Sequence, residues 1–283
     1  MARSLLTHLS RRRFLLAAGA VLADGARPKF SGKFGLEIYS LRREAQKDLP
    51  ATLAMIRKFG TTDLEVGDFY GRNAFDVLCV TDHVHRRDDP WLPADAPLRG
   101  VHAGNHADYL AEIQSQAERA RREYDLLVVP GLELSYNDLD PNLAAHAVAV
   151  GCRNFVGVDD GPWPALERAR LEGAALVAAH PFRARRGAVP SRVTMRFARE
   201  WRVARAAVDR WELFNRCDLF GWVAERGLAA VASGDFHRPE HLYGWKTLLP
   251  CAKDEAAVVA YLRSSRPAFL SRFDEPAELL RAA

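Results

Sequence analysis

The stretch FDVLCVTDH, residues 75–83, joins a run of mostly apolar residues directly to the polar triplet Thr81-Asp82-His83. Two later stretches have the same form, because residues 126–132 lead to Glu133 and residues 176–179 lead to His180. Apolar runs of this length that stop at a polar residue are typical of buried parallel strands. We therefore predict an α/β fold whose strands end in side chains that can bind metal.

Further residues of the same chemical type follow along the chain. In an α/β barrel, side chains at the carboxyl ends of the strands converge on one mouth. Imidazole and carboxylate groups gathered there are the ligand set for zinc, manganese or iron. A single histidine after a strand is usually a structural residue, but six such positions favour a metal centre. The candidates are His83, Glu133, His146, His180, Asp235 and His237.

Length and composition are those of a globular protein. The chain has 283 residues, of which 48% are hydrophobic, enough for one large α/β barrel or two smaller domains. The net charge is +4, but four arginines and only one acidic residue lie within the first 26 residues. Without that segment the net charge falls to +1, so charge does not argue for a nucleic-acid partner. No apolar run is long enough to span a bilayer, and we expect no membrane partner.

The first 26 residues have the pattern of an export signal. Ser10-Arg11-Arg12-Arg13-Phe14 precedes a short apolar run and small residues, and resembles a twin-arginine signal. The alternative is a basic amino terminus with no targeting role. Use of the signal predicts a periplasmic location, and the alternative predicts a cytoplasmic one.

Residues 27–73 form a separate segment. The pattern predicts a strand at 34–39, a helix at 49–59 that Gly60 ends, and a second strand at 63–69. The stretches GLEIYSLR, residues 35–42, and VGDFYG, residues 66–71, resemble the opening β-α-β of the sugar phosphate isomerase/epimerase barrels, which are related to xylose isomerase. This resemblance covers residues 33–71 and does not continue beyond them.

From residue 75 the sequence resembles a different family. The stretches FDVLCVTDH (75–83), VPGLELS (129–135), AHP (179–181) and SGDFH (233–237) resemble, in this order, the PHP family of polymerase and histidinol phosphatase metal-dependent phosphoesterases. The resemblance spans residues 75–273. It implies a distorted, TIM-like β/α barrel of the PHP type over residues 74–283, with up to three metal ions. The isomerase-like segment would then supply the first strand or strands.

The resemblance also implies roles for individual residues. Glu133 matches the carboxylate that bridges two metals, and His146 and His180 complete the second metal's site. Asp235 matches a ligand of the first metal, while His83 and His237 match two ligands of the third. Catalytic roles are implied for Glu133, Asp235 and His237.

One part of the family pattern is missing. Family members open with a strand that ends in His-x-His, but His8 is the only histidine before His83 in this chain. The first and third metal sites are therefore expected to be incomplete, because a catalytic zinc usually keeps three protein ligands. Possible substitutes are His85, His102, His106, Glu37 and Glu65, for which a solvated or structural role is the alternative.

Two basic residues are candidate phosphate ligands. Arg183 follows His180-Pro181, with Arg185 and Arg186 close behind, and guanidinium groups match phosphate oxygens in bidentate fashion. Lys246 is the second candidate. A solvated basic loop explains the arginines equally well.

The leading interpretation is a metal-dependent phosphoesterase that acts on a small phosphorylated substrate with zinc, manganese or iron. The first alternative is a non-catalytic, metal-binding PHP relic, since the missing histidines belong to two of three sites. The second is a sugar phosphate isomerase/epimerase, which only residues 33–71 suggest. A join of fragments from two reading frames or neighbouring genes is another explanation for the change near residue 73.

Overall fold

The computed structural model describes residues 35–37, 63–65, 76–93, 100–184, 190, 192–237, 241 and 244–273. The chain divides into two compact units, Met1–Tyr70 and Gly71–Ala283. The export signal predicted at residues 1–26 and the helix predicted at 49–59 lie outside the described residues. The assignment of domains at residues 26 and 73 stays a prediction.

In the first unit, the described residues form one pair of short strands. β1 (Gly35–Glu37) and β2 (Asp63–Glu65) pair in parallel, with Glu37 opposite Glu65 in the register. Parallel strands need a crossover connection, so this pairing fits a β-α-β unit. The resemblance of this segment to isomerase barrels, and its part in closing a barrel, stay predictions.

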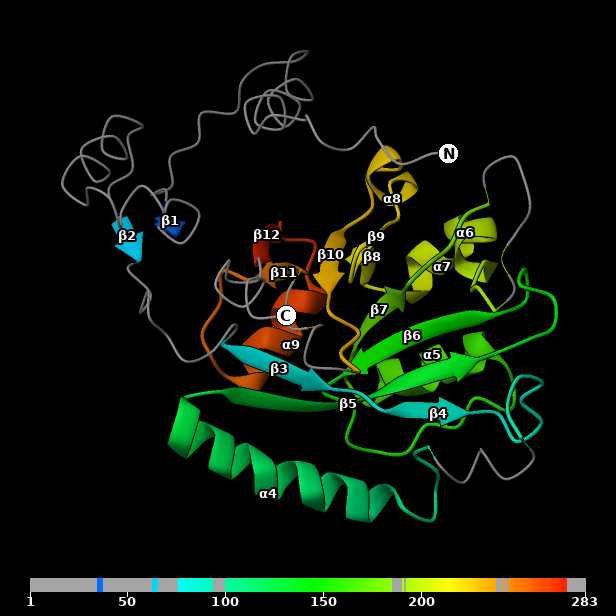
Figure 1. Ribbon diagram of the computed structural model, residues 1–283, viewed down its shortest axis with the longest axis horizontal. Helices are drawn as coiled ribbons and strands as arrows, with labels where there is room; N and C mark the ends of the chain where they lie inside the picture. The colour runs from blue at the N-terminus through cyan, green and yellow to red at the C-terminus, as the bar shows by residue number, and fades with distance from the viewer. Residues whose placement is uncertain are drawn as a thin grey trace, which may run out of the picture. The chain divides into compact units, whose positions relative to one another are not determined.

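The second unit is built on a curled sheet (Figure 1). Its strands are β3 (Val77–Val80), β4 (His83–His85), β5 (Leu127–Tyr136), β6 (Ala145–Val150), β7 (Ala175–Ala179), β8 (Arg210–Asn215), β9 (Asp218–Leu219) and β10 (Ala230–Ser233). Their order is β10-β8-β7-β6-β5-β3, while β4 pairs with β5 and β9 with β8. Two further strands, β11 (Gly244–Leu248) and β12 (Phe269–Phe273), form an antiparallel pair.

This sheet has the curvature of a half-barrel. Within the described ranges no strand pairing joins β3 or β4 to β10. The α/β class predicted from the sequence is confirmed, and a closed TIM-like barrel stays a prediction.

The six helices of the described chain are α4 (His106–Tyr124), α5 (Pro162–Leu171), α6 (Arg196–Arg199), α7 (Trp201–Ala207), α8 (Trp222–Glu225) and α9 (Glu255–Arg263). Local signals explain several boundaries, since Pro162 opens α5 and the Asp254 side chain accepts a hydrogen bond from the N–H of Ala257 at the start of α9. Leu219 pairs in the short strand β9, and α8 begins only at Trp222. None of the helices in the described part combines the length and apolar character needed to cross a bilayer.

Two features of the sheet differ from the parallel strands expected. β6 runs antiparallel to both β5 and β7, whereas β7–β8 and β8–β10 are parallel. β5 also continues to Tyr136, so Glu133 lies inside a strand and not at its end. The apolar runs predicted the strands but could not give their directions, which depend on pairing between distant segments.

Alternation along the strands separates the two faces of the sheet. Leu132, Ala147, Leu176 and Trp211 point to the outer face, where they form one hydrophobic cluster with residues of α5, α7 and α8, including Leu166. The opposite, inner face carries Glu133, Ser135, His146 and Glu212. These residues occupy the alternate positions of their strands, and all four are buried. Helices therefore cover the outer face, and polar side chains gather on the inner one.

The inner face has a polar end and an apolar end. At the apolar end, Val150, Ala175 and Val177 pack with Val258 and Leu262 of α9 in a second hydrophobic cluster. The strand directions place the carboxyl ends of β7, β8 and β10, and the amino end of β6, at the other end. The candidate metal residues lie there.

A buried arginine fastens α9 to the sheet. Arg210 is only 1% exposed, and its guanidinium donates hydrogen bonds of 2.8–3.0 Å to the carbonyls of Tyr261, Leu262, Ser264 and Arg266. These carbonyls lie at and beyond the carboxyl end of α9, where a cation also stabilises the helix dipole. One side chain thus satisfies four backbone acceptors.

Replacing Arg210 with methionine is expected to destabilise the protein strongly. The apolar side chain fills similar space but leaves buried carbonyls unpaired, at a cost of about 3 kcal/mol or more in the free energy of unfolding. Urea denaturation followed by circular dichroism measures the change. The control is Arg263→Met, which removes one exposed hydrogen bond to Gly173 and should cost less than about 1 kcal/mol. Equal losses in the two variants would contradict this role for Arg210.

Candidate metal centre

The centre is built around the carboxylate of Glu133, which is 6% exposed. Three imidazoles surround it: Oε1 lies 2.9 Å from Nδ1 of His146 and 3.9 Å from Nε2 of His180, and Oε2 lies 3.7 Å from Nδ1 of His83. Nε2 of His180 and Nδ1 of His146 are 3.0 Å apart. Among the described residues, His83, Glu133 and His146 also form a group whose donor atoms all lie within 4.8 Å of one another.

Strand register brings these residues together. His83 of β4 pairs with Glu133, Ser135 pairs with His146, and His146 pairs with Ala179, the residue before His180. Partners across neighbouring strands point to the same face of a sheet. Four segments that are far apart in the sequence therefore deliver their side chains to one point.

The protonation state of His146 follows from its neighbours. The amide nitrogen of Asn137 donates to Asp89 at 2.8 Å, so the amide oxygen faces Nε2 of His146 at 2.9 Å. That oxygen can only accept, and Nε2 must carry a proton. In the neutral ring, Nδ1 then presents a lone pair towards Glu133 and His180. A carboxylate or carbonyl partner that fixes the ring in this way is typical of metal-binding histidines.

The charge states of the centre follow from burial and from the imidazoles. Burial by itself would raise the pKa of Glu133, but a proton on Nδ1 of His146 and positive charge on the three histidines outweigh it and lower the pKa to about 2. A metal cation bound at Nδ1 would take the place of that proton in balancing the carboxylate. Burial, aided by the charge of His146, lowers the pKa of His180 to about 4. At neutral pH the centre therefore holds a carboxylate and an uncharged imidazole, the forms that bind metal.

A second carboxylate, Glu212, supports His180 from below. It is 1% exposed and accepts hydrogen bonds from the backbone N–H of His180, from Ser233 and from Asn215. Burial raises the pKa of Glu212 to about 7 despite these bonds, and the charge of Glu133 adds to the rise. Glu212 thus positions the backbone of His180. Its carboxylate makes no close contact with the imidazole ring, since its nearest oxygen is 4.0 Å from Nδ1 of His180.

Backbone strain is concentrated at this end of the sheet. His180, Asp235 and Arg216 have φ angles of 30°, 40° and 50°, a left-handed region that residues other than glycine rarely adopt. Each is held by side-chain hydrogen bonds: Glu212 binds the N–H of His180, Thr194 binds its carbonyl, and Arg216 binds the carbonyl of Asp235. Such outliers are typical of functional sites.

Asp235 and His237 lie beside the imidazole cluster. The ring of His237 is 6.0 Å from that of His83, and its Nδ1 is 3.1 Å from Oδ1 of Asp235. His85 stacks on His83 with ring centroids 5.1 Å apart, and its Nδ1 lies 3.8 Å from Asp89. The structure therefore brings the six predicted metal residues into one neighbourhood and adds His85 at its edge.

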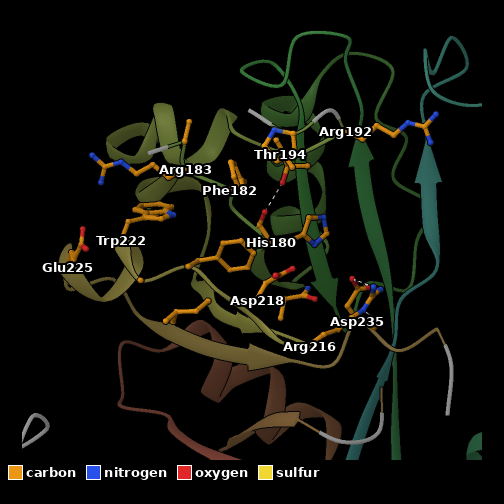
Figure 2. Close-up of a pocket in the computed structure, with 17 residues that line it drawn as sticks. His180, Phe182, Arg183, Arg192, Thr194, Arg216, Asp218, Trp222, Glu225 and Asp235 are labelled. Carbon is orange, nitrogen blue, oxygen red and sulfur yellow. Dashed lines mark hydrogen bonds and ion pairs between the residues drawn. The ribbon is translucent and has the colours of Figure 1, made fainter. Parts of the chain in front are cut away.

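A cavity of about 1010 Å³ opens next to His180 and Asp235 (Figure 2). Arg183, Arg192, Arg216, Thr194 and Asn215 provide much of its polar lining. Its apolar lining comes from Phe182, Leu219, Phe220 and Trp222. The space suits a small molecule that has both an anionic group and an apolar part.

The two predicted phosphate ligands have different positions. Arg183 lines the cavity as expected, while Arg185 and Arg186 lie outside the described residues. Lys246, in β11, is not among the residues that line this cavity. Its Nζ is buried with no hydrogen-bond partner in the described part of the chain, and burial lowers its pKa. Its role as a phosphate ligand stays a prediction.

Other sequence candidates have structural roles or lie outside the description. His102 accepts a hydrogen bond from the N–H of Gly104 in the loop before α4, and His106 packs on Phe155. The side chains of Glu37 and Glu65 are outside the described part. No local pattern singles out Asn137, Asp89, Ser135 or Arg216, since each acts through a partner that is distant in sequence or lies on another strand.

The residues present fit a divalent metal ion. Nδ1 of His146 and Oε1 of Glu133 are both acceptors 2.9 Å apart, and acceptors this close together need a proton or a cation between them. In the tautomer of His180 that carries its proton on Nδ1, Nε2 is a third acceptor at the same place. Two or three imidazoles with one carboxylate form the donor set of zinc, manganese or iron, and not of calcium. The structure therefore supports a divalent metal site without identifying the metal.

Neither a protein-family model nor a curated protein matches this chain. Among solved structures, it is similar to a two-domain protein from Bacteroides vulgatus that contains a predicted PHP-like metal-dependent phosphoesterase. The TM-score is 0.49 and the sequence identity is 16%, and the match covers 74% of this chain and 60% of the other. The chain thus spans about three fifths of that protein's length. The candidate centre rests on the residues and distances described above.

The raised pKa of Glu212 predicts how stability depends on pH. The folded state keeps this proton up to about pH 7, whereas the unfolded chain releases it near 4.5, so the contribution is lost as pH rises between these values. Relative to Glu212→Gln, the wild type should lose about 2–3 kcal/mol of unfolding free energy between pH 5 and pH 8. Urea denaturation with a chelator present measures this difference.

The glutamine variant is a suitable reference because the hydroxyl of Ser233 can rotate to accept from the new amide nitrogen. The other groups that titrate are common to both proteins, so their effects cancel in the difference. Parallel stability profiles for the wild type and the variant would show that Glu212 is ionised throughout this range.

Proposed function

We propose that this protein is a metal-dependent phosphoesterase that hydrolyses a small phosphate ester bound in the cavity beside the imidazole cluster. The observation that carries the proposal is the buried carboxylate of Glu133 among three histidines, with Nδ1 of His146 2.9 Å from the carboxylate and 3.0 Å from Nε2 of His180. The order of the PHP-like motifs in the sequence is the second support.

Glu133, His146 and His180 would hold the first metal, with His83 next to them. A divalent cation bound there supplies a Lewis acid that polarises a phosphoryl oxygen and lowers the pKa of a water molecule. Glu133 contributes the negative charge that balances the cation. Asn137 keeps the ring of His146 in one tautomer and one orientation, which raises its basicity as a ligand.

Other residues would bind the substrate and handle protons. The arginines in the cavity, Arg183 among them, match a phosphate group, and the apolar lining suits the organic part of an ester. His237 is half exposed and paired with Asp235, so this pair is suited to exchanging a proton with water or with a leaving group. The proposed substrate is therefore a small phosphorylated molecule rather than a nucleic acid. If the amino-terminal signal is used, the protein would act in the periplasm.

Metal content tests the first part of the proposal. The purified wild type, dialysed against manganese or zinc, should retain about one equivalent per chain. Glu133→Gln keeps the side-chain shape but removes the charge, and should bind less than about a tenth of an equivalent. Asn137→Leu should weaken the metal's affinity about 10–100-fold, because the ring of His146 loses the partner that orients it. Atomic emission and equilibrium dialysis give both values.

Glu118→Ala is the matched control, since Glu118 is an exposed carboxylate on α4 and should leave metal content unchanged. A wild type with no bound metal, or equal metal content in wild type and Glu133→Gln, would overturn the proposal.

Turnover separates an enzyme from a non-catalytic relic. The manganese-loaded wild type should hydrolyse a generic aryl phosphomonoester or phosphodiester, and His180→Ala should reduce the rate at least about 100-fold, because the metal loses a ligand next to the cavity. Glu118→Ala should retain the wild-type rate. Metal binding without turnover on either class of substrate would favour the relic, for which the absence of a His-x-His strand is the supporting observation.

A further inference from the structure

Arg216 occupies an unusual position at the edge of the metal centre. It follows directly after β8, adopts a left-handed backbone conformation, and lines the cavity together with His180 and Asp235 (Figure 2). Its guanidinium makes an ion pair of 2.7 Å from Nη2 to Oδ2 of Asp235 and donates from Nε to the carbonyl of the same residue at 2.9 Å. Nη2 also lies 2.9 Å from Nδ1 of His237.

These contacts engage the two residues that the sequence assigned to further metals. A cation bound by Asp235 would compete with the guanidinium for Oδ2, and Nδ1 of His237 faces the same guanidinium. The guanidinium is permanently charged, so it would also repel a cation at this point. In the described structure, Asp235 and His237 are thus partners of an arginine.

The His-x-His motif, whose histidines would be further metal ligands, is missing from the sequence before His83. Without those histidines, Asp235 and His237 offer too few ligands to hold a second cation firmly. Arg216 instead places a permanent positive charge beside Asp235 in the lining of the cavity. Nη1 of Arg216 makes no hydrogen bond to any described residue, so its N–H groups can donate to a ligand in the cavity.

We propose that Arg216 replaces a second metal ion: it neutralises Asp235 and binds a phosphoryl oxygen of the substrate, so that the centre works with one metal. This inference rests on the phosphoesterase function proposed above and specifies how its substrate is held. The ligand class is a phosphate ester whose phosphoryl group lies between Arg216 and the Glu133 cluster. Arg216 then binds the substrate, whereas Glu212 only positions His180.

The test measures binding and does not depend on turnover. Manganese stoichiometry is determined by equilibrium dialysis, and inorganic phosphate is then titrated into the manganese-loaded full chain by calorimetry. The wild type should bind about one manganese per chain. Arg216→Gln should keep that manganese but bind phosphate at least about tenfold more weakly, because a charge-assisted hydrogen bond is lost. Arg216→Lys should recover part of the affinity, since it restores the charge without the bidentate geometry.

Arg226→Gln is the control for a general loss of positive charge, because Arg226 lies over the ring of Trp201, 5.0 Å from its centroid, and does not line the cavity. It should bind phosphate like the wild type. The inference is overturned if Arg216→Gln binds phosphate with wild-type affinity, or if the wild type takes up two manganese ions per chain. Failure of the proposed function looks different, since a wild type that binds no manganese overturns both.

Discussion

Glu133 is a buried carboxylate on the inner face of the curled sheet, and its negative charge must be balanced by neighbouring groups. The carboxylate is nearly inaccessible to water, and three imidazoles approach it from β4, β6 and the end of β7. A buried carboxylate without partners would take up a proton. Protons on the imidazoles keep it ionised, and a cation bound by the deprotonated ring nitrogens would serve the same purpose.

This arrangement depends on the strand directions. β6 is antiparallel to its neighbours, which brings His146, its second residue, level with Ser135 and with the end of β7. If β6 were parallel, His146 would lie at the opposite end, where α9 and its apolar cluster cover the inner face. The apolar end and the polar end are thus consequences of the same topology. Arg210 fastens α9 at one end, and Glu212 holds His180 at the other.

The charges around the cavity show the same balance. Asp235 and His237 both contact the guanidinium of Arg216. These contacts connect the turn after β8 to the segment after β10. The left-handed conformations of Arg216, Asp235 and His180 indicate that these turns are shaped by their side-chain contacts and not by local backbone preference. The proposed one-metal centre follows from this combination of imidazoles on one side and a guanidinium on the other.

Local sequence patterns predicted a substantial part of this. The apolar runs before Thr81, Glu133 and His180 are strands, as the sequence predicted. The prediction of Glu133 at a strand end was wrong. A polar residue after an apolar run can mark the end of a strand, or it can belong to a strand that continues with polar residues on one face, and the sequence looks the same in both cases. The pairing of β11 with β12 could not be predicted either, because β12 comes more than twenty residues later in the chain.

The sequence by itself determined the types of donor, their order along the chain and the absence of a His-x-His strand before His83. Those are local properties that can be read without knowing which segments pair. Only the tertiary structure decided the direction of β6, the tautomer of His146 and the partner of Asp235. Each of these depends on hydrogen bonds or register between segments that are distant in sequence, and such pairings are selected by the packing of the whole sheet.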